Sequence, residues 1–168
     1  MKTYHRYEYI AVYDTDEVIV PTHHANWSDL MSDLALHGPH DSWYFRNFFF
    51  FQDSLGLARP EDVEAGDVPE YHQMLRHIYR SAWHTPWNVK CLHDPGRVLT
   101  IHNHQPVTCL ARRSCSCRAV RQSRASLHHY KADCSPSVRA SCQVRDTFLI
   151  TVIFISLKFL EIHSMKVK

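Results

Sequence analysis

Three carboxylates stand within four positions near the start of the chain, at Asp14, Asp16 and Glu17. Like charges this close repel one another, and each carboxylate resists removal from water. A divalent cation relieves both costs, because hard oxygen ligands suit Mg²⁺ or Mn²⁺. The Asp-x-Asp-Glu cluster therefore predicts a metal site that holds a diphosphate. The plainer alternative is a turn whose acids are solvated.

Two apolar segments enclose these acids. Residues 9–13 are rich in β-branched and aromatic types, which favours a buried strand that ends at the carboxylates. Residues 18–20 resume the apolar pattern at once, and Pro21 closes it. Because no Gly or Asn is present to make a bend, the pattern argues against an ordinary polar turn between the two segments.

Amphipathic helices are predicted in two places. Asn26 is a suitable N-cap, and apolar residues recur behind it at helical spacing until Gly38 and Pro39 end the helix. The apolar face of this first helix consists of Trp27, Leu30, Met31 and Leu34. Pro69 suits the first turn of a second helix. Its apolar face consists of Tyr71, Met74, Leu75 and Ile78. We interpret the first helix as scaffold, with Trp27 in a packing role.

Further strands bring polar side chains with them. Residues 43–51 are the most aromatic stretch and predict a buried strand, within which Arg46 needs a partner for its charge. Residues 98–101 predict a short strand. His102 and His104 follow it on one face, given the two-residue period of a strand. Two imidazoles on one face can bind a metal, although a hydrogen-bonded structural role is the more common one.

Three segments carry weaker signals. Residues 53–68 form a predicted loop that contains the acids Glu61 and Asp62, but nothing beyond proximity makes either a catalytic base. No helix or strand is predicted in residues 111–127, which are rich in Arg, Ser and Cys. Residues 147–160 are strongly apolar, yet shorter than the roughly 20 residues that span a bilayer. A buried terminal strand, an interfacial segment and non-native translated sequence are the alternatives there.

Length and composition narrow the class of protein. A chain of 168 residues predicts one domain with a proper core. The six cysteines include no Cys-x-x-Cys pair, which argues against a zinc ribbon or a thioredoxin-type redox motif. The arginines of residues 111–145 suggest nucleic-acid binding, but no RNA or DNA motif accompanies them. We therefore expect no nucleic-acid partner.

Several motifs taken together resemble family 92 of the animal glycosyltransferases. They are Tyr13-Asp-Thr-Asp-Glu-Val-Ile-Val-Pro21, Asn26-Trp27, Tyr44-Phe-Arg-Asn-x-Phe-Phe50, His77-Ile-Tyr-Arg80, Lys90-Cys91, Arg97-Val-Leu-Thr-Ile-His-Asn-His104 and His129-Tyr-Lys131. Each is weak alone, but the set is specific, and the resemblance runs in order from about Tyr4 to Cys134.

The resemblance implies an α/β fold: an incomplete GT-A-like (Rossmann-like) mixed sheet flanked by helices. Members of this family carry nucleotide-binding βα units and a transmembrane anchor before the Asp-x-Asp strand, and neither precedes Asp14 here. We therefore expect residues 1–134 to be the C-terminal part of a family 92 catalytic domain. Residues 135–168 form an atypical hydrophobic tail. Membrane association is expected through the missing anchor or through this tail.

The activity that the resemblance implies is inverting, metal-dependent transfer of a hexose from a UDP-sugar to a glycan acceptor. UDP-galactose is the implied donor. Asp14 and Asp16 would hold Mn²⁺ (or Mg²⁺), and a late histidine would complete the metal shell. His129 is the first candidate for that ligand and His104 the second. Glu17 would orient the site or ligate through water.

Other matched positions are implied contacts of the donor or the acceptor. They are Glu17, Arg46, His104 and Lys131. Arg46 either pairs with a nearby carboxylate or lies beside the diphosphate or the acceptor sugar. Lys131 stands where the family usually has Arg, so it keeps the charge but loses bidentate phosphate binding. The catalytic base is left unassigned.

The family resemblance also implies the lumenal side of the Golgi membrane, an oxidising compartment in which an even number of cysteines favours disulfides. Cys109 with Cys134, and Cys91 with one of the others, are the expected pairs. An alternative function is a truncated, catalytically inactive fragment of such an enzyme, which keeps part of the fold but cannot hold the nucleotide.

Overall fold

The computed structural model describes residues 7–51, 74, 77, 79–111, 114–132, 134 and 144–147. The chain divides into two compact units. Unit 1 comprises Met1–Asn47 and Thr85–His128, and unit 2 comprises Phe48–His84 and His129–Lys168. The division passes through two strands, β3 (Ser42–Phe51) and β9 (Ala125–Lys131).

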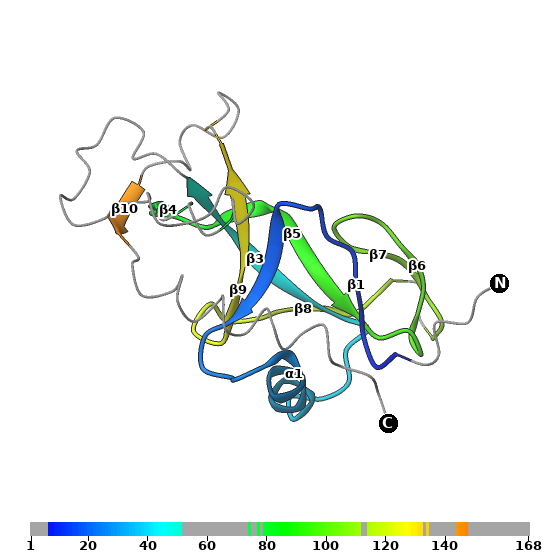
Figure 1. Ribbon diagram of the computed structural model, residues 1–168. Helices are drawn as coiled ribbons and strands as arrows, with labels where there is room; N and C mark the ends of the chain where they lie inside the picture. The colour runs from blue at the N-terminus through cyan, green and yellow to red at the C-terminus, as the bar shows by residue number, and fades with distance from the viewer. Residues whose placement is uncertain are drawn as a thin grey trace. The chain divides into compact units, whose positions relative to one another are not determined.

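Strands make up about half of the described chain, which contains one α-helix, α1 (Trp27–Ala35) (Figure 1). The other strands are β1 (Ile10–Ala11), β2 (Glu17–Pro21), β4 (Tyr79–Ser81), β5 (Thr85–His93), β6 (Val98–Ile101), β7 (Pro106–Cys109), β8 (Cys117–Ala119) and β10 (Val144–Thr147).

Strand β3 organises the sheet of unit 1. It pairs antiparallel with β5 and parallel with β8, and β5 pairs antiparallel with β1. Strand β9 pairs with β2 and β3, whereas β6 and β7 form a separate antiparallel hairpin. In unit 2 the end of β3 pairs with β4, which pairs with β10. This mixed sheet with its helix confirms the predicted α/β class and is consistent with an incomplete glycosyltransferase-like fold.

The aromatic residues of β3 explain why this strand was predictable. Phe48, Phe49, Phe50 and Phe51 are consecutive and each at most 7% exposed, although successive residues of a strand point to opposite faces. A strand that is covered on both faces has a nearly continuous apolar sequence. In unit 1 this strand joins a core that consists of Ile19, Leu30, Met31, Leu34, Trp43, Phe45, Leu92, Val120, Ala125 and Leu127.

Helix α1 confirms the first predicted helix. The side chain of Asn26 accepts a hydrogen bond from the backbone N–H of Asp29 at 2.8 Å, as an N-cap does. Leu30, Met31 and Leu34 are buried in the core. The indole of Trp27 packs against the same core and donates to the carbonyl of Ile19 at 3.0 Å, which confirms its packing role.

Strand β5 contains a bulge directly before Lys90. Phe45 of β3 pairs with Lys90 of β5, and Asn47 pairs with Thr85. A step of two residues along β3 therefore matches a step of five along β5. Asn88 has a φ of 61°, in the left-handed region that Asn tolerates better than most residues. Within the bulge, the hydroxyl of Thr85 donates a hydrogen bond to the carbonyl of Trp87 at 2.8 Å. The Trp87 residue itself is 77% exposed.

Some secondary structure differs from the predictions. The strand at residues 9–13 is reduced to β1 (Ile10–Ala11). Strand β8 lies within residues 111–127, where no element was expected; its sequence, Cys-Arg-Ala, has no apolar period, and it forms because β3 offers a parallel edge. Strand β4 begins at Tyr79, directly after the last apolar residue of the second predicted helix, because the end of β3 pairs with this segment. Most of the second predicted helix falls outside the described residues.

The cysteine pairing also differs from the expectation. Cys109 and Cys115 form a disulfide with a Cα–Cα distance of 5.4 Å, well within the usual range. Cys134 is disulfide-bonded as well, whereas Cys91 and Cys117 are free. The expected pair of Cys109 with Cys134 is therefore wrong, and so is a bonded Cys91. Burial raises the pKa of the Cys91 thiol to about 12, so this thiol is unreactive.

Stability is expected to fall by about 2–3 kcal/mol as the pH drops from 7 to 4, because of His93. This imidazole is 1% exposed, and its Nδ1 lies 2.8 Å from the Ser42 hydroxyl. Burial lowers the pKa of His93 to about 4. Between that value and 6.5 the unfolded chain binds the proton and the folded chain does not, so stability rises with pH.

Urea unfolding at a series of pH values measures this effect of His93. Carboxylates also titrate over part of the range, so the comparison is made with the His93→Gln variant. The variant is expected to show a flatter profile between pH 7 and 4. Equal slopes for the two proteins would contradict the prediction.

Candidate functional site

The acids near the start of the chain lie in a tight turn between β1 and β2. The backbone N–H of Glu17 donates to the carbonyl of Asp14 at 3.1 Å, and the N–H of Asp14 donates to the Glu17 carboxylate, also at 3.1 Å. The Glu17 side chain thus closes a bend that contains neither Gly nor Asn. The expectation that no ordinary turn joins the two apolar segments is therefore wrong. Asp16 is half-buried within this turn.

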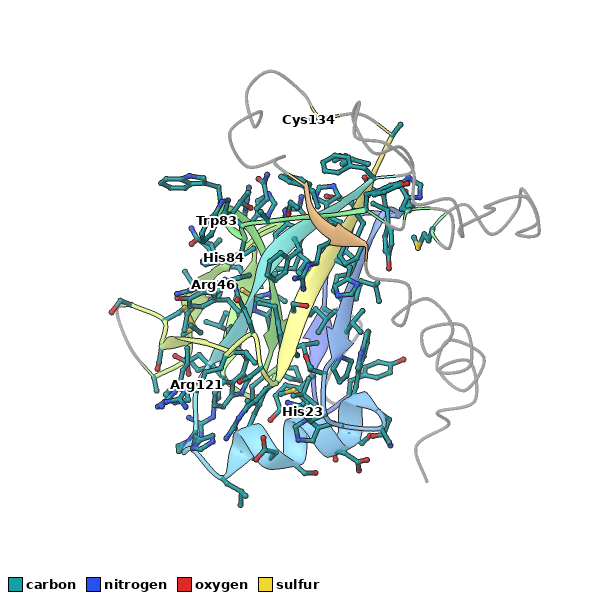
Figure 2. The ribbon with its side chains drawn as sticks, turned by 90° about the vertical axis from the view of Figure 1, so that its left-hand side faces the viewer. His23, Arg46, Trp83, His84, Arg121 and Cys134 are labelled. Carbon is teal, nitrogen blue, oxygen red and sulfur yellow. A yellow bond between two sulfur atoms is a disulfide. The ribbon has the colours of Figure 1, made fainter. Side chains whose placement is uncertain are left out.

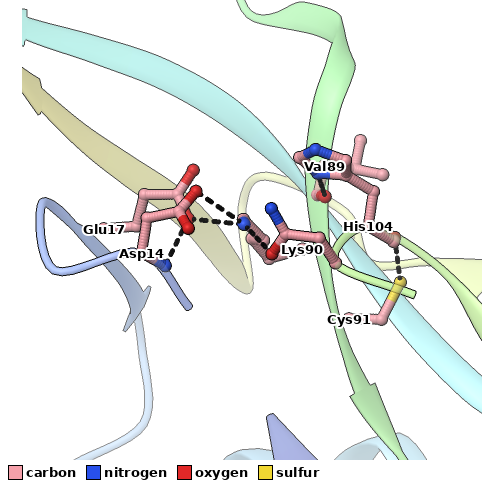
Figure 3. Close-up of polar contacts among 7 residues, drawn as sticks. Asp14, Glu17, Val89, Lys90, Cys91 and His104 are labelled. Atoms are coloured by element: carbon pink, nitrogen blue, oxygen red, sulfur yellow. Dashed lines mark hydrogen bonds and ion pairs between the residues drawn. The ribbon is translucent and has the colours of Figure 1, made fainter. Parts of the chain in front are cut away.

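The ammonium group of Lys90 faces the acid turn from β5 (Figure 3). Its Nζ lies 3.0 Å from Asp14 Oδ2, 3.0 Å from Glu17 Oε2 and 2.6 Å from Asn103 Oδ1. An ammonium group has three N–H donors, so these three oxygens satisfy it. The Lys90 side chain is 0% exposed.

The two ion pairs of Lys90 differ in their surroundings. The Glu17 side chain is 1% exposed, so its pair with Lys90 is sealed from water. The Asp14 side chain is 52% exposed and presents its carboxylate to solvent. The three carboxylates and this ammonium together carry a formal charge of −2. The turn is thus held from inside by a buried cation and remains acidic.

The loop between β6 and β7 completes this arrangement. The His104 ring donates through Nδ1 to the carbonyl of Val89 at 3.0 Å, and the Cys91 thiol donates to the carbonyl of His104 at 3.1 Å (Figure 3). These bonds fasten the loop to β5 on both sides of Lys90 and place Asn103 against its ammonium. His102 and His104 have ring centroids 6.2 Å apart, as neighbours on one side of the loop.

Lys90 was missed as a functional residue in the sequence, where it appeared only within a family motif. One signal was available: Lys90 interrupts the apolar stretch Val89 to Leu92, and a charge within a buried strand requires an opposite charge. The sequence does not indicate which carboxylates pair with Lys90, because they lie more than 70 positions away. Asp14 and Lys90 are separated by 76 positions.

His129 and Lys131 both lie on β9. His129 is 6% exposed, and its ring centroid is 5.4 Å from that of Phe49, also in unit 2. Lys131 ends the strand and is half-buried. Asp14 and Asp16 belong to unit 1 and His129 to unit 2. Their joint role as metal ligands therefore stays a prediction.

Arg46 lies on β3 between two buried neighbours, Phe45 and Asn47 (Figure 2). It is itself half-buried, which suits a cation that combines a packed stem with a polar head. Both interpretations of Arg46, structural and ligand-binding, remain open. The acids Glu61 and Asp62 fall outside the described residues.

The acid turn fits a metal that arrives with its diphosphate. In the described part of the chain, no group of three or more His, Cys, Asp and Glu side chains is arranged to hold a metal ion. Mg²⁺ is usually bound through one or two carboxylates, substrate phosphates and waters, and Mn²⁺ favours the same hard oxygen ligands. Asp14 and Asp16 supply carboxylates of this kind at an acidic turn. The donor set thus suits a cation shared with a ligand rather than a closed protein cage.

Within the described ranges, no helix is long and apolar enough to cross a bilayer. The apolar segment at residues 147–160 lies outside those ranges apart from Thr147, the last residue of β10.

Comparison with known families matches residues 1–153 to the family described as glycosyltransferase family 92. The match includes the acid turn, Lys90 and β9, and it extends into the segment after residue 134. Comparison with curated proteins gives no significant match.

Proposed function

Because the chain belongs to glycosyltransferase family 92, we propose that it acts on a UDP-sugar and transfers the hexose, with inversion, to a hydroxyl of a glycan. Galactose is the proposed sugar. The observation that carries the proposal is the acid turn: the exposed carboxylate of Asp14 is held by a buried ion pair between Lys90 and Glu17. An ordered, solvent-facing carboxylate is the group that a diphosphate-bound cation requires.

Asp14 and Asp16 are the proposed ligands of Mn²⁺ (or Mg²⁺), with His129 as the third. When bound, such a cation neutralises the charge that develops on the departing diphosphate. Glu17 has a positioning role, because its carboxylate bonds both to the backbone of Asp14 and to Lys90. It thereby sets the conformation of the turn and keeps the Asp14 carboxylate at the surface.

The remaining assignments extend this proposal. Arg46, His104 and Lys131 are proposed to contact the donor or the acceptor. His104 would do so from a loop that three hydrogen bonds fasten to β5. The base that deprotonates the acceptor is a carboxylate still to be identified. The proposed location is the lumenal side of the Golgi membrane.

Thermal unfolding of the full chain with UDP, Mn²⁺, or both tests the proposal. We expect Mn²⁺ alone to change Tm little, since the metal needs the phosphates as ligands. UDP and Mn²⁺ together are expected to stabilise the protein by about 2.7 kcal/mol when UDP is present at about a hundred times its Kd. The Asp16→Asn variant should remain folded and lose this stabilisation.

Asp29→Asn is the matched control, because Asp29 is an exposed acid of unit 1 that bonds at Asn26 rather than in the acid turn. It should respond to UDP and Mn²⁺ as the wild type does. Equal responses of Asp16→Asn and the wild type would remove Asp16 from the site.

A second candidate function is that of a fragment that keeps this fold and binds no nucleotide. It is favoured by one observation: Lys90 already provides a cation for Asp14 and Glu17. If the wild type gains no stability from UDP with Mn²⁺, this second function replaces the first.

A further inference from the structure

Trp87 is exposed in a way that packing does not explain. Its side chain is 77% exposed, although Trp is the largest apolar residue and β5 offers a core on which to bury it. The other tryptophans of unit 1 behave differently: Trp43 is 2% exposed, and Trp27 packs against the core. An exposed indole does not contribute the free energy that its burial would give to folding. We therefore expect Trp87 to have a role in binding.

The backbone of β5 is shaped to present this side chain. The bulge inserts extra residues opposite β3, and Asn88 is the one described non-glycine residue with positive φ. A strained backbone of this kind persists only where its surroundings enforce it, and such strain gathers at ligand sites. Trp87, the residue directly before Asn88, is 77% exposed at this bulge.

The bulge is rigid at its base. The amide of Asn47 donates to the Thr85 hydroxyl at 3.4 Å, and that hydroxyl donates to the carbonyl of Trp87 at 2.8 Å. Asn47 is 0% exposed and Thr85 is 2% exposed. The bond between them is buried, and the bond to Trp87 is partly buried. The indole therefore projects from a fixed point and loses little conformational entropy when a ligand covers it.

The composition of the bulge indicates the class of ligand. Residues 86–89, Pro-Trp-Asn-Val, carry no charge, which does not favour an anionic or cationic partner. A flat indole face beside an amide matches a neutral sugar ring, which has an apolar C–H face and hydroxyls at its edge. Trp87 is three residues before Lys90, at most about 11 Å along an extended chain. A short oligosaccharide can span this distance along β5 to Lys90, whose side chain reaches the acid turn.

We propose that Trp87 is a stacking platform for a neutral sugar ring of the acceptor glycan, held out by the β5 bulge beside the acid turn. The inference rests on the proposed transferase function for its choice of the acceptor. The platform positions the acceptor chain and makes no contact with the diphosphate.

Binding of the full-length chain to an array of immobilised neutral oligosaccharides tests the platform. Trp87→Ala is expected to weaken retention about tenfold or more, as loss of an aromatic anchor does, whereas Trp87→Phe keeps most of it. Trp83→Ala is the matched control, because Trp83 is also exposed, at 59%, but belongs to unit 2 (Figure 2). It should bind as the wild type does.

Stabilisation by UDP with Mn²⁺, measured on the same Trp87→Ala protein, separates this inference from the proposed function. Wild-type retention that is lost in Trp87→Ala but kept in Trp83→Ala supports the platform, even if UDP fails to stabilise any variant. The platform is overturned if the wild type retains no oligosaccharide, if Trp87→Ala retains as much, or if Trp83→Ala loses as much.

Discussion

Replacing Lys90 by methionine is expected to lower the free energy of unfolding by about 3–5 kcal/mol. Methionine has a similar shape and fits the space of the lysine stem, so the change removes the charge rather than the packing. Glu17, 1% exposed, would be left as a buried carboxylate without the ammonium that now lies 3.0 Å away. Urea unfolding followed by circular dichroism measures the loss.

The double variant Lys90→Met with Glu17→Gln controls for the stranded charge. A glutamine amide still accepts the hydrogen bond from the backbone of Asp14 but brings no charge into the interior. We expect this protein to be more stable than Lys90→Met alone, because replacing both members of a buried pair costs less than replacing one. A loss below about 1 kcal/mol for the single variant, typical of an exposed pair, would contradict the burial of this cluster.

Replacing Phe45 by alanine is expected to destabilise the protein by about 3–5 kcal/mol. Phe45 is 0% exposed in the core of unit 1, and it faces Lys90 across the register of β3 and β5. The neighbouring elements are tied by the sheet and cannot close over the space that the ring leaves. The same urea measurement detects the loss.

Trp87→Ala is the matched control for Phe45→Ala, because both remove an aromatic ring from paired strands. Trp87 is 77% exposed, so its removal should change stability by no more than about 0.5 kcal/mol. A large loss in Trp87→Ala would mean that the indole packs on the protein, and it would also weaken the sugar-platform proposal. Comparable, small losses in both variants would contradict the burial of Phe45.

Local patterns were enough to predict the elements whose signals lie within a few residues. Helix α1 follows from the Asn26 cap and the spacing of its apolar face, and β3 from its aromatic run. Strand β6 coincides with its predicted range of 98–101. In each case, the residues that decide the structure are neighbours in the sequence, so propensity and burial point the same way.

Other features depend on partners that the sequence does not reveal. Strand β8 exists because β3 accepts a parallel neighbour, and Cys109 pairs with Cys115 because the chain after β7 returns to it. The β5 bulge arises from a mismatch in register with β3. Register and pairing are properties of two segments together, and a pattern within one segment does not contain them.

The candidate site also combines residues that the sequence pattern identifies with a partner that it does not. The three acids were predicted to hold a divalent cation, and that remains a prediction. The structure pairs two of them, Asp14 and Glu17, with the ammonium group of Lys90, which the sequence did not indicate. A metal remains the proposal for the outward side of the turn. The family comparison adds what neither the spacing nor the contacts provide, which is the class of reaction.

Lys90 joins three separate segments of the chain. Its ammonium group bonds to Asp14 in the acid turn, 76 positions away, and to Asn103 in the loop after β6, 13 positions away. A synthetic peptide that reproduced the turn would contain the acids but none of their counter-charge. Grafting the motif onto another scaffold would therefore require transplanting a piece of β5 and the loop after β6 as well. The ion pairs of the turn should form late in folding, since the chain between Asp14 and Lys90 must close before they meet.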